Sequence, residues 1–161
     1  MNELWELVNE RGEKLGIIHQ RGVRLPEGLC HLGVEVWCRV GDKILTTKRH
    51  PDKWQGGHWE ATGGSVVLGE EVCEGAVREL AEETGITVHV DKLIHLGERL
   101  FGNFYAHSYL VTLDELPEVT LQEGETVDFK WVTREEFEAL SLTYGTRDRY
   151  TLYGDKIFAD R

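Results

Sequence analysis

Three carboxylates are spaced so that one face of a helix would carry all of them: Glu79, Glu82 and Glu83. At about 3.6 residues per turn they share an arc of about 100°, with Arg78 at its flank. Like charges at this spacing destabilise an exposed helix by roughly 0.2–0.5 kcal/mol per pair. One interpretation is a solvated acidic face. The other, favoured by the glycine-rich loop that precedes the segment, is a site for Mg²⁺ or Mn²⁺, since hard cations prefer several oxygen ligands.

A helix and a loop must position these carboxylates, and the sequence predicts both. The helix is expected over residues 70–84, and Gly85 would end it as a C-terminal cap. Its apolar stripe, which would pack on a sheet, consists of Cys73, Ala76, Val77, Leu80 and Thr84. Residues 48–69 contain five glycines and no helical period, which predicts a long loop with at most one short strand near Trp59. Loops of this length in a compact domain are usually functional.

Alternating apolar residues predict strands on both sides of the helix. Leu4–Val8 and Leu15–Ile18 indicate a hairpin. His31–Val40 alternates with a period of two, which is typical of a half-buried strand. Further strands are expected over residues 43–47, 87–96, 104–113 and 127–132.

Two more helices complete the predicted elements. Thr133, with Glu136 three residues later, forms a capping box and predicts a helix start. The tail after Ser141 is expected to add a short terminal helix. Strands on both sides of one strong helix indicate a mixed α/β or α+β sandwich.

Composition restricts the class of protein. The chain has 161 residues, 40% apolar and 29% charged, which fits one globular domain. A net charge of −11 disfavours a nucleic-acid polymer as partner, because such binders usually carry a basic stripe. No apolar run approaches the roughly 20 residues of a membrane helix, and the acidic start lacks a signal-peptide pattern. Three widely spaced cysteines fit a reducing compartment, so we expect a cytoplasmic protein without membrane contact.

Residues 64–86 resemble the signature of the Nudix hydrolases, G-x5-E-x7-R-E-U-x-E-E-x-G-U, in which U is aliphatic. All nine specified positions match: Gly64, Glu70, Arg78, Glu79, Leu80, Glu82, Glu83, Gly85 and Ile86. The resemblance implies one Nudix domain over residues 1–161, with the box at 64–86 and an amino-terminal hairpin extension at 1–28. It implies an α/β/α sandwich with a mixed sheet. It also implies metal-dependent hydrolysis of a pyrophosphate bond in a nucleoside diphosphate or another organic diphosphate.

By this resemblance, the box residues receive roles. Glu79, Glu82 and Glu83 would bind Mg²⁺ or Mn²⁺, and one of them could double as general base. Glu70 would be a further or outer ligand, and the backbone carbonyl near Gly64 would also coordinate. Arg78 would orient one of the carboxylates through a bidentate pair. The alternative for Arg78 is a surface ion pair.

Three candidates lie outside the box. Relatives carry an additional glutamate before a strand that ends in Trp-Val, and Glu125 in the run GETVDFKWV is the matching residue, with Glu123 as its competitor. Glu125 would be an extra metal ligand or the base. Arg49 and Lys48, at the end of a predicted strand, are expected to bind substrate phosphates, Arg49 first.

Two other functions remain in view. The flanking segments look similar to the isopentenyl-diphosphate isomerase branch of the family, which makes an isomerase the first alternative. That reaction needs a cysteine and a histidine at positions that hold Gly63 and Ser65 here. A non-catalytic ligand-binding Nudix domain is the second, although such domains usually lose box glutamates. We expect a small-molecule diphosphate as the partner, and a homodimer through the amino-terminal hairpin is possible.

Overall fold

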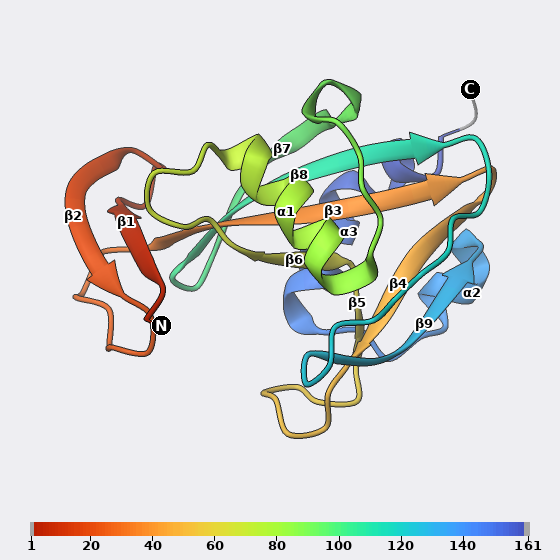
Figure 1. Ribbon diagram of the computed structural model, residues 1–161, viewed down its shortest axis with the longest axis horizontal. Helices are drawn as coiled ribbons and strands as arrows, with labels where there is room; N and C mark the ends of the chain where they lie inside the picture. The colour runs from red at the N-terminus through yellow and green to blue at the C-terminus, as the bar shows by residue number, and fades with distance from the viewer. Residues whose placement is uncertain (1, 160–161) are drawn as a thin grey trace.

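The computed structural model describes residues 2–159, and a mixed sheet forms its centre (Figure 1). The central strands β3 (His31–Val40) and β8 (Phe104–Leu113) run parallel and pair along their full lengths. Strand β4 (Lys43–Arg49) pairs with β3 in the antiparallel direction. The strand order β5-β4-β3-β8-β7 therefore combines both orientations, which confirms the predicted mixed sheet.

Four further strands complete this sheet. Strands β5 (Trp59–Glu60) and β9 (Thr126–Val132) pair with β4, and β7 (Ile94–Phe101) pairs with β8. Strand β6 (Thr62–Ser65) pairs with β3. The loop predicted over residues 48–69 thus contains a second strand, which the sequence hides because Thr-Gly-Gly-Ser has no alternating apolar residues.

Strand β7 begins later than the sequence predicts. The range 87–96 was expected to be extended, but a 3-10 turn, η1 (Val90–Lys92), occupies its middle. The N–H of Asp91 donates to the His89 ring at the start of this turn. The register of β7 also shifts between His95 and Gly97. Such an irregularity breaks the period of two, so the second half of the strand has no clear sequence pattern.

The predicted amino-terminal hairpin is confirmed. Strands β1 (Leu4–Val8) and β2 (Lys14–Gln20) are antiparallel and form a separate small sheet at one end of the molecule (Figure 1). Val8 and Cys30 exchange backbone hydrogen bonds of 2.9 and 2.8 Å, which anchor the hairpin next to the start of β3. The hairpin therefore lies near the loop that precedes α1, where Leu68 donates to the carbonyl of Leu4 at 2.8 Å.

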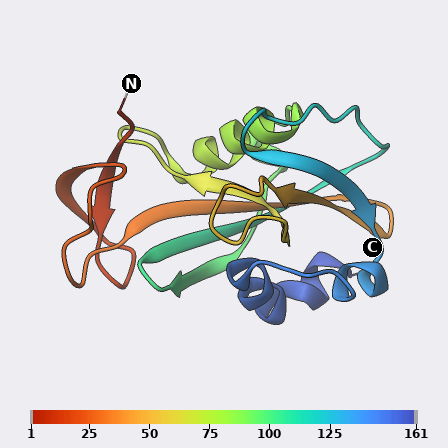
Figure 2. The same ribbon diagram turned by 90° about the horizontal axis from the view of Figure 1, so that it is seen from below.

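Helices cover both faces of the main sheet (Figure 2). On one face lies α1 (Val72–Thr84), which ends at Gly85 in the left-handed conformation with φ 74°, as predicted. On the other lie α2 (Arg134–Glu138), which begins with the predicted capping box, and α3 (Tyr144–Ile157). The terminal helix was expected to be short, but it has 14 residues, because the Thr143 side chain caps it and its apolar residues pack on the sheet.

The core has two halves, one on each side of the sheet. In one half, Leu80 of α1 packs with sheet residues such as Val34 and Val36, and in the other, Phe137 of α2 and Ile157 of α3 pack with Trp37. Strand β3 is consequently buried on both faces, so the prediction of a half-buried strand was wrong. Within residues 2–159, no helix has the length and apolar character that a membrane span requires.

Candidate active site

A cavity of about 270 Å³ lies beside α1 and β6 and is lined by six carboxylates and four cationic side chains. We call it the acidic cavity. Seven of the nine predicted site residues line it: Arg49, Gly64, Arg78, Glu79, Glu82, Glu83 and Glu125. The other two, Lys48 and Glu70, are not among its lining residues. The fold therefore brings most of the predicted residues to one place.

Arg78 donates hydrogen bonds to three glutamates of the box. Its Nε and Nη2 atoms donate to the two carboxylate oxygens of Glu70, at 2.6 and 3.0 Å. Its Nη1 atom donates to Glu79 at 2.9 Å and to Glu82 at 3.2 Å, and Nη2 also donates to the carbonyl of Ser65 at 2.9 Å. The hydrogen bond to Glu70 is the largest cause of a raised pKa at Arg78. Arg78 thus fixes the orientation of two carboxylates, while Glu70 supports the arginine from outside the cavity.

The two predicted phosphate-binding cations, Lys48 and Arg49, are consecutive residues of β4. Side chains alternate across a strand, so Arg49 and Lys48 point to opposite faces. Arg49 lines the acidic cavity and donates to both oxygens of Glu60 at 3.1 and 3.2 Å. The Lys48 ammonium lies 5.9 Å from the centre of the Trp59 ring and lines neither this cavity nor the pocket described below. The structure therefore places Arg49, but not Lys48, at the site.

Glu83 has the most unusual environment in the cavity. Its side chain is buried, and its Oε2 atom has no hydrogen-bond partner within the described part of the chain. Burial, together with the nearby carboxylates of Glu60 and Glu79, raises the pKa of Glu83 well above its usual value. A buried carboxylate oxygen without a donor costs free energy, and a hard cation would satisfy it. The donor set of carboxylates therefore fits a divalent metal ion.

Gly64 leaves room for one of these carboxylates. A Cβ atom at this position would lie 2.3 Å from the carboxyl carbon of Glu79, closer than non-bonded atoms can approach. We expect Gly64→Ala to displace the Glu79 carboxylate and to lower turnover by about 10-fold or more, the cost typical of disturbing a metal ligand.

The fold should tolerate the Gly64→Ala substitution, because only the end of a flexible side chain must move. Steady-state kinetics and a thermal unfolding curve check both expectations. The matched control is Ser65→Ala, one residue further along β6. Unchanged turnover in Gly64→Ala would contradict the role of this contact.

Sequence reasoning missed several residues of the acidic cavity. Glu60 follows Trp59 in a segment predicted to be mostly loop, and nothing in its neighbourhood marks it as functional. Glu3 and Arg21 come from the amino-terminal hairpin, far from the box in sequence. The hairpin therefore contributes charged groups to the site, whereas the sequence suggested only an interface role for it.

Glu125 is the predicted residue from the far end of the chain. It lies in the loop before β9, lines the acidic cavity and forms an ion pair with Lys53. Its competitor, Glu123, is not among the lining residues.

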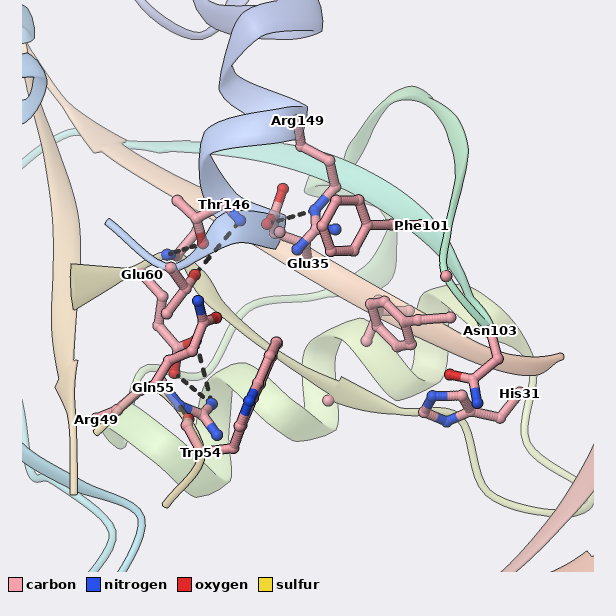
Figure 3. A pocket seen from close by; sticks show the side chains of 18 residues that line it. His31, Glu35, Arg49, Trp54, Gln55, Glu60, Phe101, Asn103, Thr146 and Arg149 are labelled. Atoms are coloured by element: carbon pink, nitrogen blue, oxygen red, sulfur yellow. Dashed lines mark hydrogen bonds and ion pairs between the residues drawn. The ribbon is translucent and has the colours of Figure 1, made fainter. Parts of the chain in front are cut away.

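A second cavity, of about 470 Å³, adjoins the first, and Figure 3 shows the residues that line this second cavity. We call it the side pocket. It shares Arg49, Glu60, Gly63 and Gly64 with the acidic cavity. Its remaining lining includes three aromatic rings, those of Trp54, Phe101 and Phe104. A molecule whose charged end lies among the box carboxylates could therefore extend an uncharged, planar end into this pocket.

Comparisons with known proteins agree with this geometry. A family model described as the NUDIX domain matches residues 30–153. An uncharacterized Nudix hydrolase of Listeria monocytogenes is 35% identical over 144 residues, which cover 86% of this chain and 84% of that protein. Among solved structures, DR0079 from Deinococcus radiodurans has a TM-score of 0.73 at 21% identity and covers 94% of this chain and 99% of its own.

A second solved structure is a bifunctional NMN adenylyltransferase/ADP ribose pyrophosphatase from Francisella tularensis, complexed with AMP and a Mn ion. It has a TM-score of 0.67 at 22% identity, over 80% of this chain and 42% of that one. At these identities the two structures support the fold alone. The family model and the Listeria relative each cover most of the chain, and on these grounds the chain belongs to the Nudix hydrolase family.

Proposed function

We propose that this Nudix hydrolase cleaves a pyrophosphate bond in a nucleoside diphosphate linked to another group, or in a related organic diphosphate, and that it requires Mg²⁺ or Mn²⁺. The observation that carries the proposal is the buried Oε2 atom of Glu83, which lies near the carboxylates of Glu60 and Glu79 and has no hydrogen-bond partner among residues 2–159. The structural neighbour from Francisella tularensis was solved with AMP and a Mn ion, which belong to the class of ligand and metal proposed here.

The box residues would hold the metal ion and keep its ligands in place. A divalent cation, when bound, neutralises charge on the phosphate oxygens and orients the attacking water. Glu79, Glu82 and Glu83 would hold it, together with the carbonyl near Gly64. Arg78 keeps Glu79 and Glu82 in place through its hydrogen bonds.

Two further residues of the acidic cavity would act on the substrate and the water. Arg49 would bind a phosphate oxygen, because its guanidinium lies in the cavity beside Glu60. Glu125 would accept the proton of the water or serve as an additional ligand. Its ion pair with Lys53 holds it at the edge of the cavity.

Isomerisation of an isoprenoid diphosphate is the less favoured alternative. It needs a titratable proton donor and acceptor across a carbon skeleton, and Gly63 and Ser65 supply none at the expected positions. The cysteines cannot substitute for them: none lines either cavity, and burial raises the pKa of Cys38 to about 12.

The test is a panel of organic diphosphates incubated with the purified chain and Mg²⁺ or Mn²⁺. We expect release of phosphate, pyrophosphate or a nucleoside monophosphate from at least one substrate, and none when EDTA is present. Isopentenyl diphosphate in deuterated water should give no deuterated dimethylallyl product by mass spectrometry. Formation of that product would establish the isomerase instead, and binding without any turnover would establish a non-catalytic domain.

Location and assembly stay predictions. We infer a cytoplasmic protein from its cysteine content, and a homodimer through the β1–β2 hairpin. Strand β2 exposes Leu15, Ile17 and Ile18, which are suitable residues for contact with a second copy.

A further inference from the structure

Arg149 is a buried cation that the proposed reaction does not use. It lies on α3, is 7% exposed and lines the side pocket (Figure 3). Its Nε atom donates to Glu35 at 2.6 Å, while its Nη1 atom is buried and has no hydrogen-bond partner within residues 2–159. An unsatisfied guanidinium nitrogen is costly in a protein interior, so a ligand that supplies an acceptor would relieve it.

Glu35 decides what kind of acceptor this can be. Its carboxylate accepts hydrogen bonds from Trp37 at 2.6 Å, from Ser108 at 3.2 Å and from Arg149. Burial raises the pKa of the Glu35 carboxyl, and the Arg149 guanidinium, with Trp37 and Ser108 as donors, opposes this by stabilising the ionised form. The charge of Glu35 therefore cancels that of Arg149. A phosphate or carboxylate at Nη1 would leave one buried negative charge in excess, so the site favours a neutral acceptor.

The walls of the side pocket fit a flat ring. Trp54, which is 73% exposed, lies on one side, and Phe101 lies on the other (Figure 3). The guanidinium carbon of Arg149 lies 5.7 Å from the centre of the Phe104 ring. Aromatic rings pack on other rings in offset-stacked or edge-to-face arrangements, so these walls suit a flat ring.

Gly145 packs against the end of the Arg149 guanidinium. It precedes Arg149 by one helical turn and also lines the side pocket. A Cβ atom there would lie 2.9 Å from Nη2 and 3.2 Å from Nη1. A side chain at residue 145 would therefore crowd both Nη atoms, so the position of the guanidinium depends on glycine here.

We propose that Arg149, held by Glu35, recognises the base of the substrate. This proposal rests on the proposed function. The side pocket would take a nucleobase with two adjacent acceptors, such as guanine through O6 and N7 or cytosine through O2 and N3. The two Nη atoms form the fork that recognises such a pair, as in arginine contacts to guanine. Adenine presents an amino donor beside N7, and uracil presents an N–H between its carbonyls, so each would leave a donor against a donor.

The test measures binding of GMP, CMP, AMP and UMP to the full chain by calorimetry in EDTA, apart from any metal-dependent step. We expect GMP and CMP to bind about 10-fold or more tightly than AMP and UMP. The double variant Glu35→Gln/Arg149→Gln, which removes both charges together, should lose this preference. Arg99→Gln is the control, because Arg99 pairs with Asp148 on the same helix but lines neither cavity.

A second variant covers the case in which the double variant does not fold. Gly145→Ala crowds the Nη atoms but touches only the end of a side chain, and alanine is the better helix former, so the variant should fold and still lose base preference. Equal binding of the four monophosphates, tightest binding of AMP, or an unchanged preference in Gly145→Ala would overturn the proposal. Metal-dependent hydrolysis without base preference would overturn base recognition and leave the proposed function standing. Selective binding of GMP and CMP by a chain that hydrolyses no diphosphate would overturn the proposed function and leave base recognition standing.

Discussion

Glu83→Gln is expected to fold normally and to lose more than about 100-fold of its turnover. Even the outer partners of metal ligands typically cost 10–100-fold when they are removed, and Glu83 would be a direct ligand. Glutamine keeps the shape of the side chain but removes the charge that a hard cation requires. Steady-state kinetics at saturating Mg²⁺ measure the loss. Near-normal hydrolysis under these conditions would exclude Glu83 from the metal site.

The same variant should respond differently to metal in an unfolding experiment. Without metal, its stability should equal or exceed that of the wild type, because the substitution removes repulsion from Glu60 and Glu79. With metal at 100 times its dissociation constant, the wild type should gain about 2.7 kcal/mol. The variant should gain much less at that concentration. Glu115→Gln, an exposed residue outside both cavities, should behave as the wild type does.

Arg78→Lys is the second substitution from which we expect a large effect, a fall of about 10–100-fold in turnover. Lysine keeps the positive charge but lacks the planar fork with which Arg78 contacts both oxygens of Glu70 and reaches Glu79 and Glu82. Without that fork, the carboxylates of Glu79 and Glu82 lose their common donor. The metal concentration that gives half-maximal activity should therefore rise together with the fall in turnover.

The control for Arg78→Lys is Arg11→Lys, at an exposed ion pair with Glu13 in the hairpin. It should leave turnover and metal requirement unchanged, since exposed pairs contribute little. Wild-type turnover and metal requirement in Arg78→Lys would show that its hydrogen bonds to the carboxylates are not needed for the reaction.

Elements that depend on local pattern could be predicted from the order of the residues. Three carboxylates on one helical face, the cap at Gly85, the capping box at Thr133 and the strand over 104–113 all follow from interactions among near neighbours. The box residues come to one site because they share a single helix and the strand before it. Their spacing fixes most of their geometry before any tertiary contact forms.

Tertiary structure decided the rest. Whether Arg49 or Lys48 faces the cavity depends on how β4 is oriented in the sheet, and the pattern of its residues alone does not reveal this. Glu35 occupies a strand position that an alternating pattern assigns to solvent. Only the packing of α3 on that face buries it and supplies Arg149, which is 114 residues away in sequence. Pairs at such separations depend on how whole elements pack, so the box could be predicted from the sequence, whereas the buried pair of Glu35 and Arg149 could not.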